Sequence, residues 1–261
     1  MFQAALNTGR YGRVYYQGKL TSKSGVYPKG TEYAHTDAGF VYTIPQAPGI
    51  YCLKDEPPPI PDVPTYLVRA IDVSSHQPMD LTTLIQDTQS SHVVVKLYLP
   101  QEVISQDWSI AQGSSAAANN CSVGGYVWGY ADLSPEQTIL DALDLIPRVC
   151  PGTSMLWLDC EEYDGVGPLG SWIQRAVYAG EGLGQRIGVY SAKWYWDKIG
   201  NPEILSRISA TGRPPLWIAQ YNDIPDLDVQ PLFGGWTRED IKGHQYTSTP
   251  IDQDVFLSDS L

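Results

Sequence analysis

From residue 66 onward, short apolar runs of strand length alternate with segments typical of helices. Repeated strand–helix units predict a parallel sheet and an α/β fold. Because helices become scarce between the last runs, we expect an irregular TIM-like barrel with eight strands and about five helices. The strands are expected at 67–73, 93–98, 126–130, a run ending at Asp159, 186–190, 216–221, 243–246 and 255–256; the helices are expected at 80–90, 107–119, from Ser134, 168–183 and 192–199.

The expected strand that ends at Asp159 runs directly into further acidic residues. Side chains alternate between the two faces of a strand, so Asp159 and Glu161 point the same way. Cys160 and Glu162 then point the other way, the first as a core residue and the second as a structural one. Two adjacent carboxylates repel each other, which raises the pKa of at least one and suits acid–base chemistry at a glycosidic bond. The alternative is that Asp159 and Glu161 only begin a solvated loop.

A further carboxylate, Asp72, falls at the end of the first expected strand. Catalytic residues of α/β barrels lie at the C-terminal ends of the strands, where Asp72, Asp159 and Glu161 are all expected. Taken alone, Asp72 could simply cap the next turn. Asp252 could likewise be an ordinary loop aspartate.

Seven short motifs occur in a fixed order: IDVSSHQ (71–77), GYVWGY (125–130), LWLDCE (156–161), IGVYS (187–191), LWIAQY (216–221), QYTS (245–248) and IDQDVF (251–256). Together they resemble the family-25 glycoside hydrolases, lysozymes that cleave bacterial peptidoglycan as N-acetylmuramidases. One such motif alone is weak, but seven in order over most of the chain are a strong resemblance. The family fold is a barrel of eight strands with fewer helices, in agreement with the pattern above.

The resemblance also implies an activity and its residues. It implies cleavage of the β-1,4 bond between N-acetylmuramic acid and N-acetylglucosamine with retention of configuration. Glu161 takes the place of the general acid/base, and Asp72, Asp159 and Asp252 take the places of active-site aspartates. In the substrate-assisted scheme proposed for the family, Asp159 orients and polarises the acetamido group while Glu161 protonates the leaving oxygen.

Two departures from the family pattern bear on substrate preference. Lys96 is followed by Leu-Tyr-Leu-Pro where the family has a Lys-(Ala/Thr)-x-Glu-Gly type of turn, and Asp254 stands where the family often has Asn. Tyrosines at strand ends are candidates for stacking on sugar rings, whereas Trp128, Trp157 and Trp217 could equally be core. His76 is interpreted as a wall residue. The candidate substrate-binding residues are Tyr130, Tyr190, Trp217, Tyr221, Gln245 and Asp254.

The first quarter of the chain differs from the rest. Residues 1–54 are rich in Tyr and Gly and favour short strands, a small β-rich extension with too little aliphatic material for its own core. Residues 55–65 are proline-rich and predict an extended linker before the barrel at 66–261. We expect residues 1–54 to dock on a larger assembly, a phage tail; the alternative is that they bind peptidoglycan.

Composition limits the partners and the location. The net charge of -12 argues against nucleic-acid binding and against docking on an anionic membrane. No metal site and no cofactor are expected, because the four cysteines and four histidines lack ligand spacing. The chain shows neither a signal-peptide pattern nor an apolar run that could span a bilayer. We therefore expect a phage protein, virion-mounted or released to the bacterial wall. Either it is an active hydrolase, or it is a structural or glycan-binding component with little turnover.

Overall fold

The computed structural model describes residues 66–162, 166–207 and 212–261, together with the backbone of six short strands nearer the N-terminus. Those strands pair antiparallel in three couples, β1 with β2, β3 with β6 and β4 with β5. Short strands were expected within 1–54, whereas the expected linker at 55–65 lies outside the described residues. The strands are β1 (Val14–Tyr16), β2 (Lys19–Thr21), β3 (Ser24–Tyr27), β4 (Glu32–His35), β5 (Phe40–Thr43) and β6 (Gly49–Cys52).

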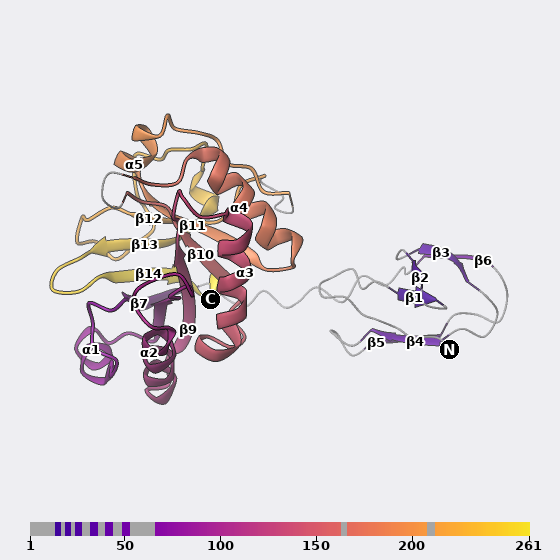
Figure 1. Ribbon diagram of the computed structural model, residues 1–261, viewed down its shortest axis with the longest axis horizontal. Coiled ribbons are helices and arrows are strands. Elements are labelled where there is room, and N and C mark those ends of the chain that lie inside the picture. The colour runs from indigo at the N-terminus through magenta and orange to yellow at the C-terminus, as the bar shows by residue number, and fades with distance from the viewer. Residues whose placement is uncertain are drawn as a thin grey trace. The chain divides into compact units, whose positions relative to one another are not determined.

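The later part of the chain forms a closed barrel of eight strands in the order β10-β11-β12-β13-β14-β7-β8-β9 (Figure 1). The strands are β7 (Leu67–Val73), β8 (His92–Lys96), β9 (Ser122–Trp128), β10 (Met155–Asp159), β11 (Arg186–Ala192), β12 (Leu216–Ala219), β13 (Ile241–Thr247) and β14 (Gln253–Leu257). The helices are α1 (Thr82–Thr88), α2 (Gln106–Ala118), α3 (Pro135–Val149), α4 (Gly170–Gly182) and α5 (Lys193–Lys198), with 3-10 turns η1 (Arg238–Asp240) and η2 (Ser258–Ser260). Within the described part, one α-helix follows each of the first five barrel strands and none follows the later ones. The predicted irregular barrel is thereby confirmed.

The last strand departs from the expected parallel sheet. β14 runs antiparallel to both β13 and β7, whereas the other neighbouring strands of the barrel are parallel. Only a short hairpin joins β13 to β14, and a parallel neighbour would need a crossover of about a dozen residues or more. The beginning of β14 therefore lies at the same rim of the barrel as the C-terminal ends of the parallel strands.

Helix α3 shows how local sequence fixes these elements. Ser134 is the N-cap, and its side-chain oxygen accepts a hydrogen bond from the backbone N–H of Gln137 at 3.4 Å, while Pro135 occupies the first turn as expected. The helix buries Ile139, Ala142, Leu145, Ile146 and Val149 on one side, at the spacing of an amphipathic helix. This apolar face joins the larger core between the barrel and its helices.

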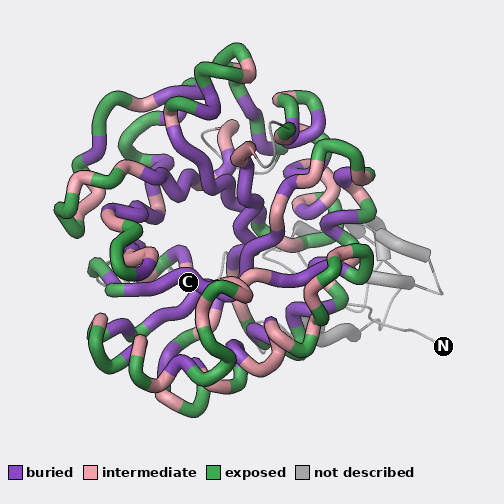
Figure 2. The backbone as a smooth tube through the Cα atoms, turned by 60° about the vertical axis from the view of Figure 1, so that its left-hand side comes forward, coloured by how far each residue is buried: buried purple, intermediate pink, exposed green. Residues whose placement is uncertain are grey.

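Figure 2 shows the strands as a ring of mainly buried residues, and a second, smaller core lies inside this ring. Aromatic rings fill it: Trp157 lies 5.7 Å from Trp217 and from Phe256, measured between ring centroids. Glycines make the space, because a Cβ atom at Gly188 would overlap Trp157 and one at Gly243 would overlap Phe256. These side chains fill the barrel interior, so an open site must lie at the rim of the barrel.

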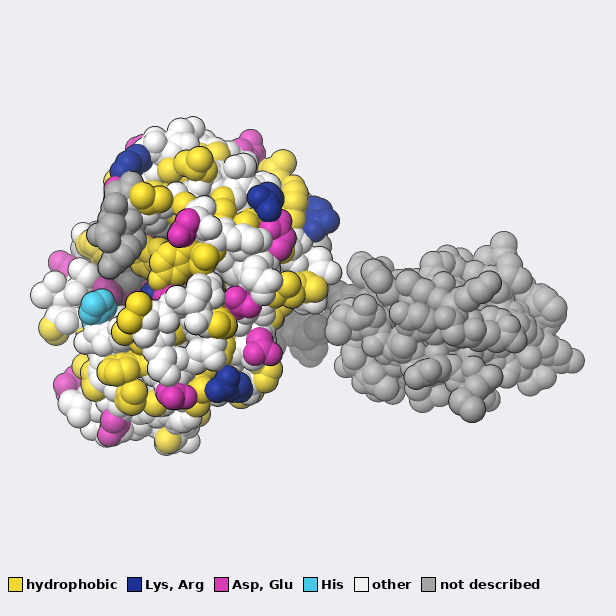
Figure 3. Space-filling view, in the orientation of Figure 1, with side chains coloured by type: hydrophobic (Ala, Val, Ile, Leu, Met, Phe, Trp, Pro, Cys, Tyr) yellow, Lys and Arg dark blue, Asp and Glu magenta, His cyan; other side chains and the backbone are white. Residues whose placement is uncertain are grey.

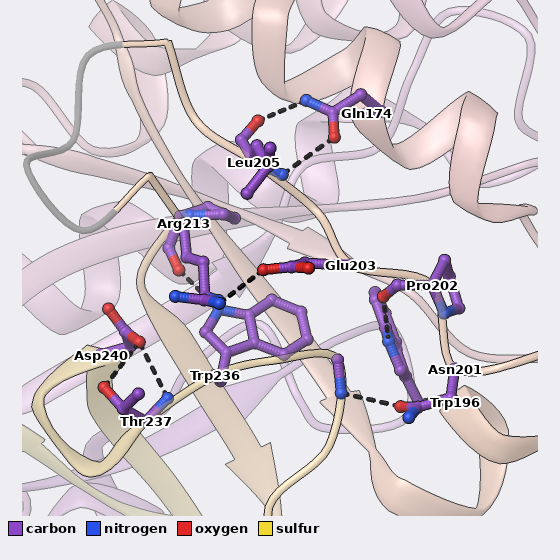
Figure 4. A network of polar contacts seen from close by, with 12 residues as sticks. Gln174, Trp196, Asn201, Pro202, Glu203, Leu205, Arg213, Trp236, Thr237 and Asp240 are labelled. Atoms are coloured by element: carbon purple, nitrogen blue, oxygen red, sulfur yellow. Dashed lines mark hydrogen bonds and ion pairs between the residues drawn. The ribbon is translucent and has the colours of Figure 1, made fainter.

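A polar network ties the segment after α5 to the segment before β13 (Figure 4). Asn201 accepts a hydrogen bond from the backbone N–H of Gly234 at 2.8 Å, and the Trp236 indole donates to the Pro214 carbonyl at 2.7 Å. Asp240 accepts from the backbone N–H and the hydroxyl of Thr237, at 2.8 and 2.9 Å. These contacts hold loops in place where helices are missing from the barrel.

Among the described residues, no helix is both long and apolar enough to cross a membrane.

Candidate active site

The carboxyl groups singled out by sequence converge on one pocket at the rim of the barrel. Asp72 and Asp159 come from the ends of β7 and β10, Glu161 follows β10, and Asp252 precedes β14. On the face shown in Figure 3, hydrophobic side chains gather beside a recess, and acidic side chains are interspersed among them. The described residues lining the pocket are Asp72, Tyr126, Trp128, Asp159, Glu161, Tyr190, Trp217, Tyr221, Gln245 and Asp252.

Glu161 has the electrostatics of a proton donor. Burial, with a further contribution from the negative charge of Asp252, raises the pKa of Glu161 to about 7. Burial also raises the pKa of Asp252 to about 6, and this increase is opposed by His76, an exposed residue near the rim. Near neutral pH the site can therefore hold a protonated Glu161 beside an ionised Asp252, which is the division of roles that acid–base catalysis uses.

An amide holds Asp72 in place. Gln245 donates from Nε2 to Asp72 Oδ2 at 2.6 Å. Its Oε1 accepts from the hydroxyls of Tyr190 and Tyr221, at 2.8 and 3.0 Å, so the amide orientation is fixed by its partners. Burial and the charge of Asp252 raise the pKa of Asp72 to about 8, although the hydrogen bond from Gln245 opposes this shift. Gln245 thus links the acidic group to two aromatic side chains of the pocket.

Asp159 is 4% exposed, and its environment is strongly perturbed. Burial and the neighbouring charge of Glu161 raise its pKa well above the usual range, and the charge of Lys96 opposes the shift. Oδ1 of Asp159 is buried without a hydrogen-bond partner among the described residues. A buried oxygen left in this way is costly unless a ligand supplies a donor.

Lys96 organises the wall next to Asp159. Its ammonium group lies 3.2 Å from Glu102 Oε1, and 4.8 and 5.5 Å from the ring centroids of Tyr98 and Trp128. Glu102 also accepts from the hydroxyl of Tyr130 at 2.7 Å and from the backbone N–H of Leu99 at 2.7 Å. The altered turn after β8 therefore retains a carboxylate partner for the lysine, supplied from further along the chain.

The candidate substrate-binding residues divide into two groups. Tyr190, Trp217, Tyr221 and Gln245 line the pocket, and Tyr221 is 60% exposed, as a surface for a sugar ring would be. The other two are not among the lining residues. Tyr130 is half-buried and bonded to Glu102 as described above. Asp254 is fully buried beneath the lining, where its Oδ1 accepts from the Trp217 indole N–H at 3.0 Å.

Four side chains of the site are absent from the candidates: Lys96, noted above only for the turn that follows it, Trp128, interpreted above as possible core, and Glu102 and Tyr126. Tyr126 and Trp128 lie two apart on β9, so both point to the same face of the strand. That spacing was the signal in the sequence for Trp128, because the structure places Tyr126 inside the barrel. No local sequence pattern predicts the ion pair between Lys96 and Glu102.

The residues around the acidic motif lie where strand geometry placed them. Cys160 belongs to the core outside the barrel, and Glu162 forms an ion pair with Lys198 of α5. Cys121, Cys150 and Cys160 are free thiols. Among the residues that the structure describes, no group of His, Cys, Asp or Glu is arranged to hold a metal ion.

A closed α/β barrel with carboxyl groups converging at its rim is an arrangement that glycoside hydrolases use. Residues 71–255 match the family model of Glycosyl hydrolases family 25, so the chain belongs to that family.

Individual relatives agree with this assignment. The probable GH family 25 lysozyme 3 of Dictyostelium discoideum is 29% identical over 130 residues, which are 48% of this chain and 26% of that protein. The chain thus spans about a quarter of that relative's length. Among solved structures, a muramidase from Trichobolus zukalii has a TM-score of 0.55 at 21% identity, covering 72% of this chain and 93% of that one. The modular Cpl-1 endolysin, solved with a peptidoglycan analogue, has a TM-score of 0.52 at 22% identity, covering 72% and 54%. At these identities the structures establish the fold.

Proposed function

We propose that this chain is a muramidase that cleaves the β-1,4 bond between N-acetylmuramic acid and N-acetylglucosamine in bacterial peptidoglycan. The observation that carries the proposal is the arrangement of Glu161 and Asp159 at one rim pocket. Glu161 has a pKa of about 7, and Asp159 presents a buried oxygen without a donor. A protonated acid and an adjacent acceptor are the two groups that a substrate-assisted glycosidase requires.

In the first step Glu161 gives its proton to the glycosidic oxygen as the bond from that oxygen to the anomeric carbon breaks. The carbonyl oxygen of the substrate's own acetamido group bonds to the anomeric carbon and forms a cationic oxazolinium ring. Asp159 Oδ1 accepts the acetamido N–H, which supplies the donor that this oxygen lacks. The same contact orients the group for attack, and the nearby acidic side chains stabilise the positive charge as it develops.

In the second step water attacks the anomeric carbon and gives a proton to the Glu161 carboxylate. The ring opens, the acetamido group is restored, and Glu161 is protonated for the next cycle. Two displacements at the same carbon give overall retention. Tyr190, Trp217 and Tyr221 provide the apolar surface against which sugar rings can pack.

The reducing end of the products tests the proposed bond. Purified cell walls are digested, the products are reduced with borohydride, and the terminal sugars are identified by mass spectrometry. Cleavage at the proposed bond leaves reduced N-acetylmuramic acid as the new terminus. Reduced N-acetylglucosamine would contradict the proposal, and the absence of any new terminus would favour a glycan-binding component without turnover.

Mounting on a phage virion through residues 1–54 stays a prediction. The similar proteins include one from Dictyostelium discoideum, one from Trichobolus zukalii and an endolysin from phage Cp-1, so they favour no single source. Residues 1–54 fused to an inert carrier should leave purified walls in the supernatant yet bind virion proteins. Strong sedimentation with the walls would favour the alternative, direct binding to peptidoglycan.

A further inference from the structure

Asp254 is a fully buried carboxyl group inside the barrel that the mechanism above does not use. It lies on β14, opposite Ala70 of β7 and opposite Gln245 of β13. Asp72 is two residues beyond Ala70 on the same strand, so Asp72 and Asp254 lie diagonally on the same inner face. Their side chains are within hydrogen-bonding reach of each other.

The two oxygens of Asp254 have different surroundings. Oδ1 accepts the Trp217 indole N–H at 3.0 Å, and an indole nitrogen can only donate. Oδ2 is buried and receives no hydrogen bond from any donor among the described residues. An ionised carboxylate would have to keep this oxygen bare beside a second carboxylate, which is an arrangement with a large desolvation cost. A proton on Oδ2 removes the difficulty, because the oxygen then becomes a donor.

We propose that Asp254 stays protonated and donates its carboxylic O–H from Oδ2 to Asp72, so that it acts as a positioning residue for Asp72. Asp72 then accepts from two sides, from Asp254 and from Gln245 Nε2. When the pair loses a proton, Asp72 becomes the charged member and Asp254 remains neutral. Asp254 therefore does the work of an amide side chain, accepting at one oxygen and donating at the other.

The neighbouring charges favour this order of ionisation. Burial, then the charges of Asp72 and Asp252, raise the pKa of Asp254 well above its usual range. The hydrogen bond from Asp254 lowers the pKa of Asp72. Tyr246 of β13 also interacts electrostatically with Asp254, whose charge raises the pKa of Tyr246, while the positive charge of Arg69 on β7 opposes that shift.

The consequence for catalysis rests on the proposed function. Asp72 lines the pocket, and two donors fix the plane of its carboxyl group relative to the bound sugar. Loss of the Asp254 donor should leave Asp72 more weakly held. Activity should then fall through the chemical step and not through unfolding.

The first test uses pH and does not depend on the substrate. Urea unfolding of the wild-type chain and of Asp254→Asn is compared between pH 5 and 8. An Asp254 that keeps its proton only in the folded state makes the unfolding constant of the wild type rise roughly tenfold per pH unit relative to the variant. A ratio of the wild-type to the variant unfolding constant that does not change with pH would overturn the proposal. An infrared difference spectrum, wild type minus variant, should show the carbonyl band of a protonated acid at pH 7; carboxylate bands alone would contradict it.

The second test measures the positioning role. Asp254→Leu keeps a side chain of similar size but neither accepts nor donates, and it should lower the turnover of cell walls by roughly tenfold or more. Asp254→Asn, which can donate to Asp72, should recover most of that loss. Equal losses in two folded variants would overturn the positioning role. If the wild type itself does not digest walls, the proposed function fails, while the unfolding and infrared results still decide where the proton lies.

Discussion

The rim pocket and the polar network between the loops in Figure 4, here called the loop network, differ in how far their polar groups are paired. In the loop network, Arg213 is paired with Glu203 and Asp240 accepts two hydrogen bonds from Thr237. Asp159 at the rim and Asp254 beneath it each keep a buried oxygen without a hydrogen-bond donor among the described residues. The first arrangement stabilises loops that no helix supports. The second costs stability, and at Asp159 it leaves an oxygen that can accept a hydrogen bond from a substrate.

Burial explains most of this difference. The pair of Glu203 and Arg213 is partly solvated, so its charges are screened and its net contribution is small. The carboxyls of the rim are shielded by the barrel wall, and like charges face one another, so their pKa values rise. Substitutions at the rim should therefore lower activity and raise stability, and substitutions in the loops should affect neither strongly.

The largest effect is expected for Glu161→Gln. Removal of the proton donor should lower wall hydrolysis by roughly 10²–10⁴-fold, with the fold intact. The measurement is release of soluble muropeptides, with the circular dichroism melting curve as the control for folding. Digestion at the wild-type rate would show that another residue donates the proton.

Asp159→Asn should also slow hydrolysis, by roughly 10²–10³-fold, because an amide can turn its N–H donors towards the acetamido N–H that Asp159 Oδ1 is proposed to accept. If the substrate's own acetamido group attacks, no covalent glycosyl-enzyme should accumulate in the wild type. Intact-protein mass spectrometry after incubation with a fluorinated substrate analogue checks this. A stable adduct on Asp159 would replace substrate assistance with an enzyme nucleophile.

Asp72→Asn should stabilise the protein at alkaline pH while it lowers activity. Burial and the charge of Asp252 raise the pKa of Asp72 to about 8, so the folded state holds a proton that the unfolded chain releases above about pH 4. The stability contributed by this proton is complete below about pH 4 and is lost as the pH rises towards 8. The variant should therefore gain up to about 1.4 kcal/mol per pH unit over that range, relative to wild type.

Urea unfolding at several pH values measures that gain. The matched control is Glu203→Gln in the loop network, which should change stability by less than about 1 kcal/mol at every pH. A gain for Asp72→Asn that does not depend on pH would remove the contrast between the two regions.

The smallest effect is expected for truncation. A chain that begins at Asp62 should fold alone and keep its activity, because the closed barrel has its own core and no free strand edge. Solubility, melting temperature and muropeptide release are compared with those of the full chain. An insoluble or inactive product would mean that residues 1–54 are part of the catalytic unit.

Much of the barrel could be predicted, because strand and helix periodicities are local. The sequence alone predicts the strand that ends at Asp159, the helix cap at Ser134 and the scarcity of helices late in the chain. The direction of β14 was missed because motif order does not reveal which way a strand enters a sheet. That direction matters, since it brings Asp252 to the rim from the beginning of a strand.

The site was predictable as far as strand ends reveal it. Asp72, Asp159, Glu161 and Asp252 do converge on one pocket. The contact between Lys96 and Glu102 was not predictable, because a loop of unknown path separates them. The position of Asp254, buried beneath the pocket, could not be predicted from the sequence either. Alternation shows which face a side chain takes, but only the stagger of the barrel sets its layer.

The pH profile of kcat/KM on a soluble peptidoglycan fragment tests the role of Glu161 most directly, because it reports the ionisation of the free enzyme. Activity should fall above about pH 7, the pKa to which burial and the charge of Asp252 raise Glu161. In Asp252→Asn the midpoint of this fall should move to lower pH, because the charge of Asp252 no longer raises the pKa of Glu161. This shift is expected whatever the maximal kcat/KM of the variant. A midpoint that does not move, or activity that does not fall in this range, would contradict the assignment of Glu161 as the proton donor.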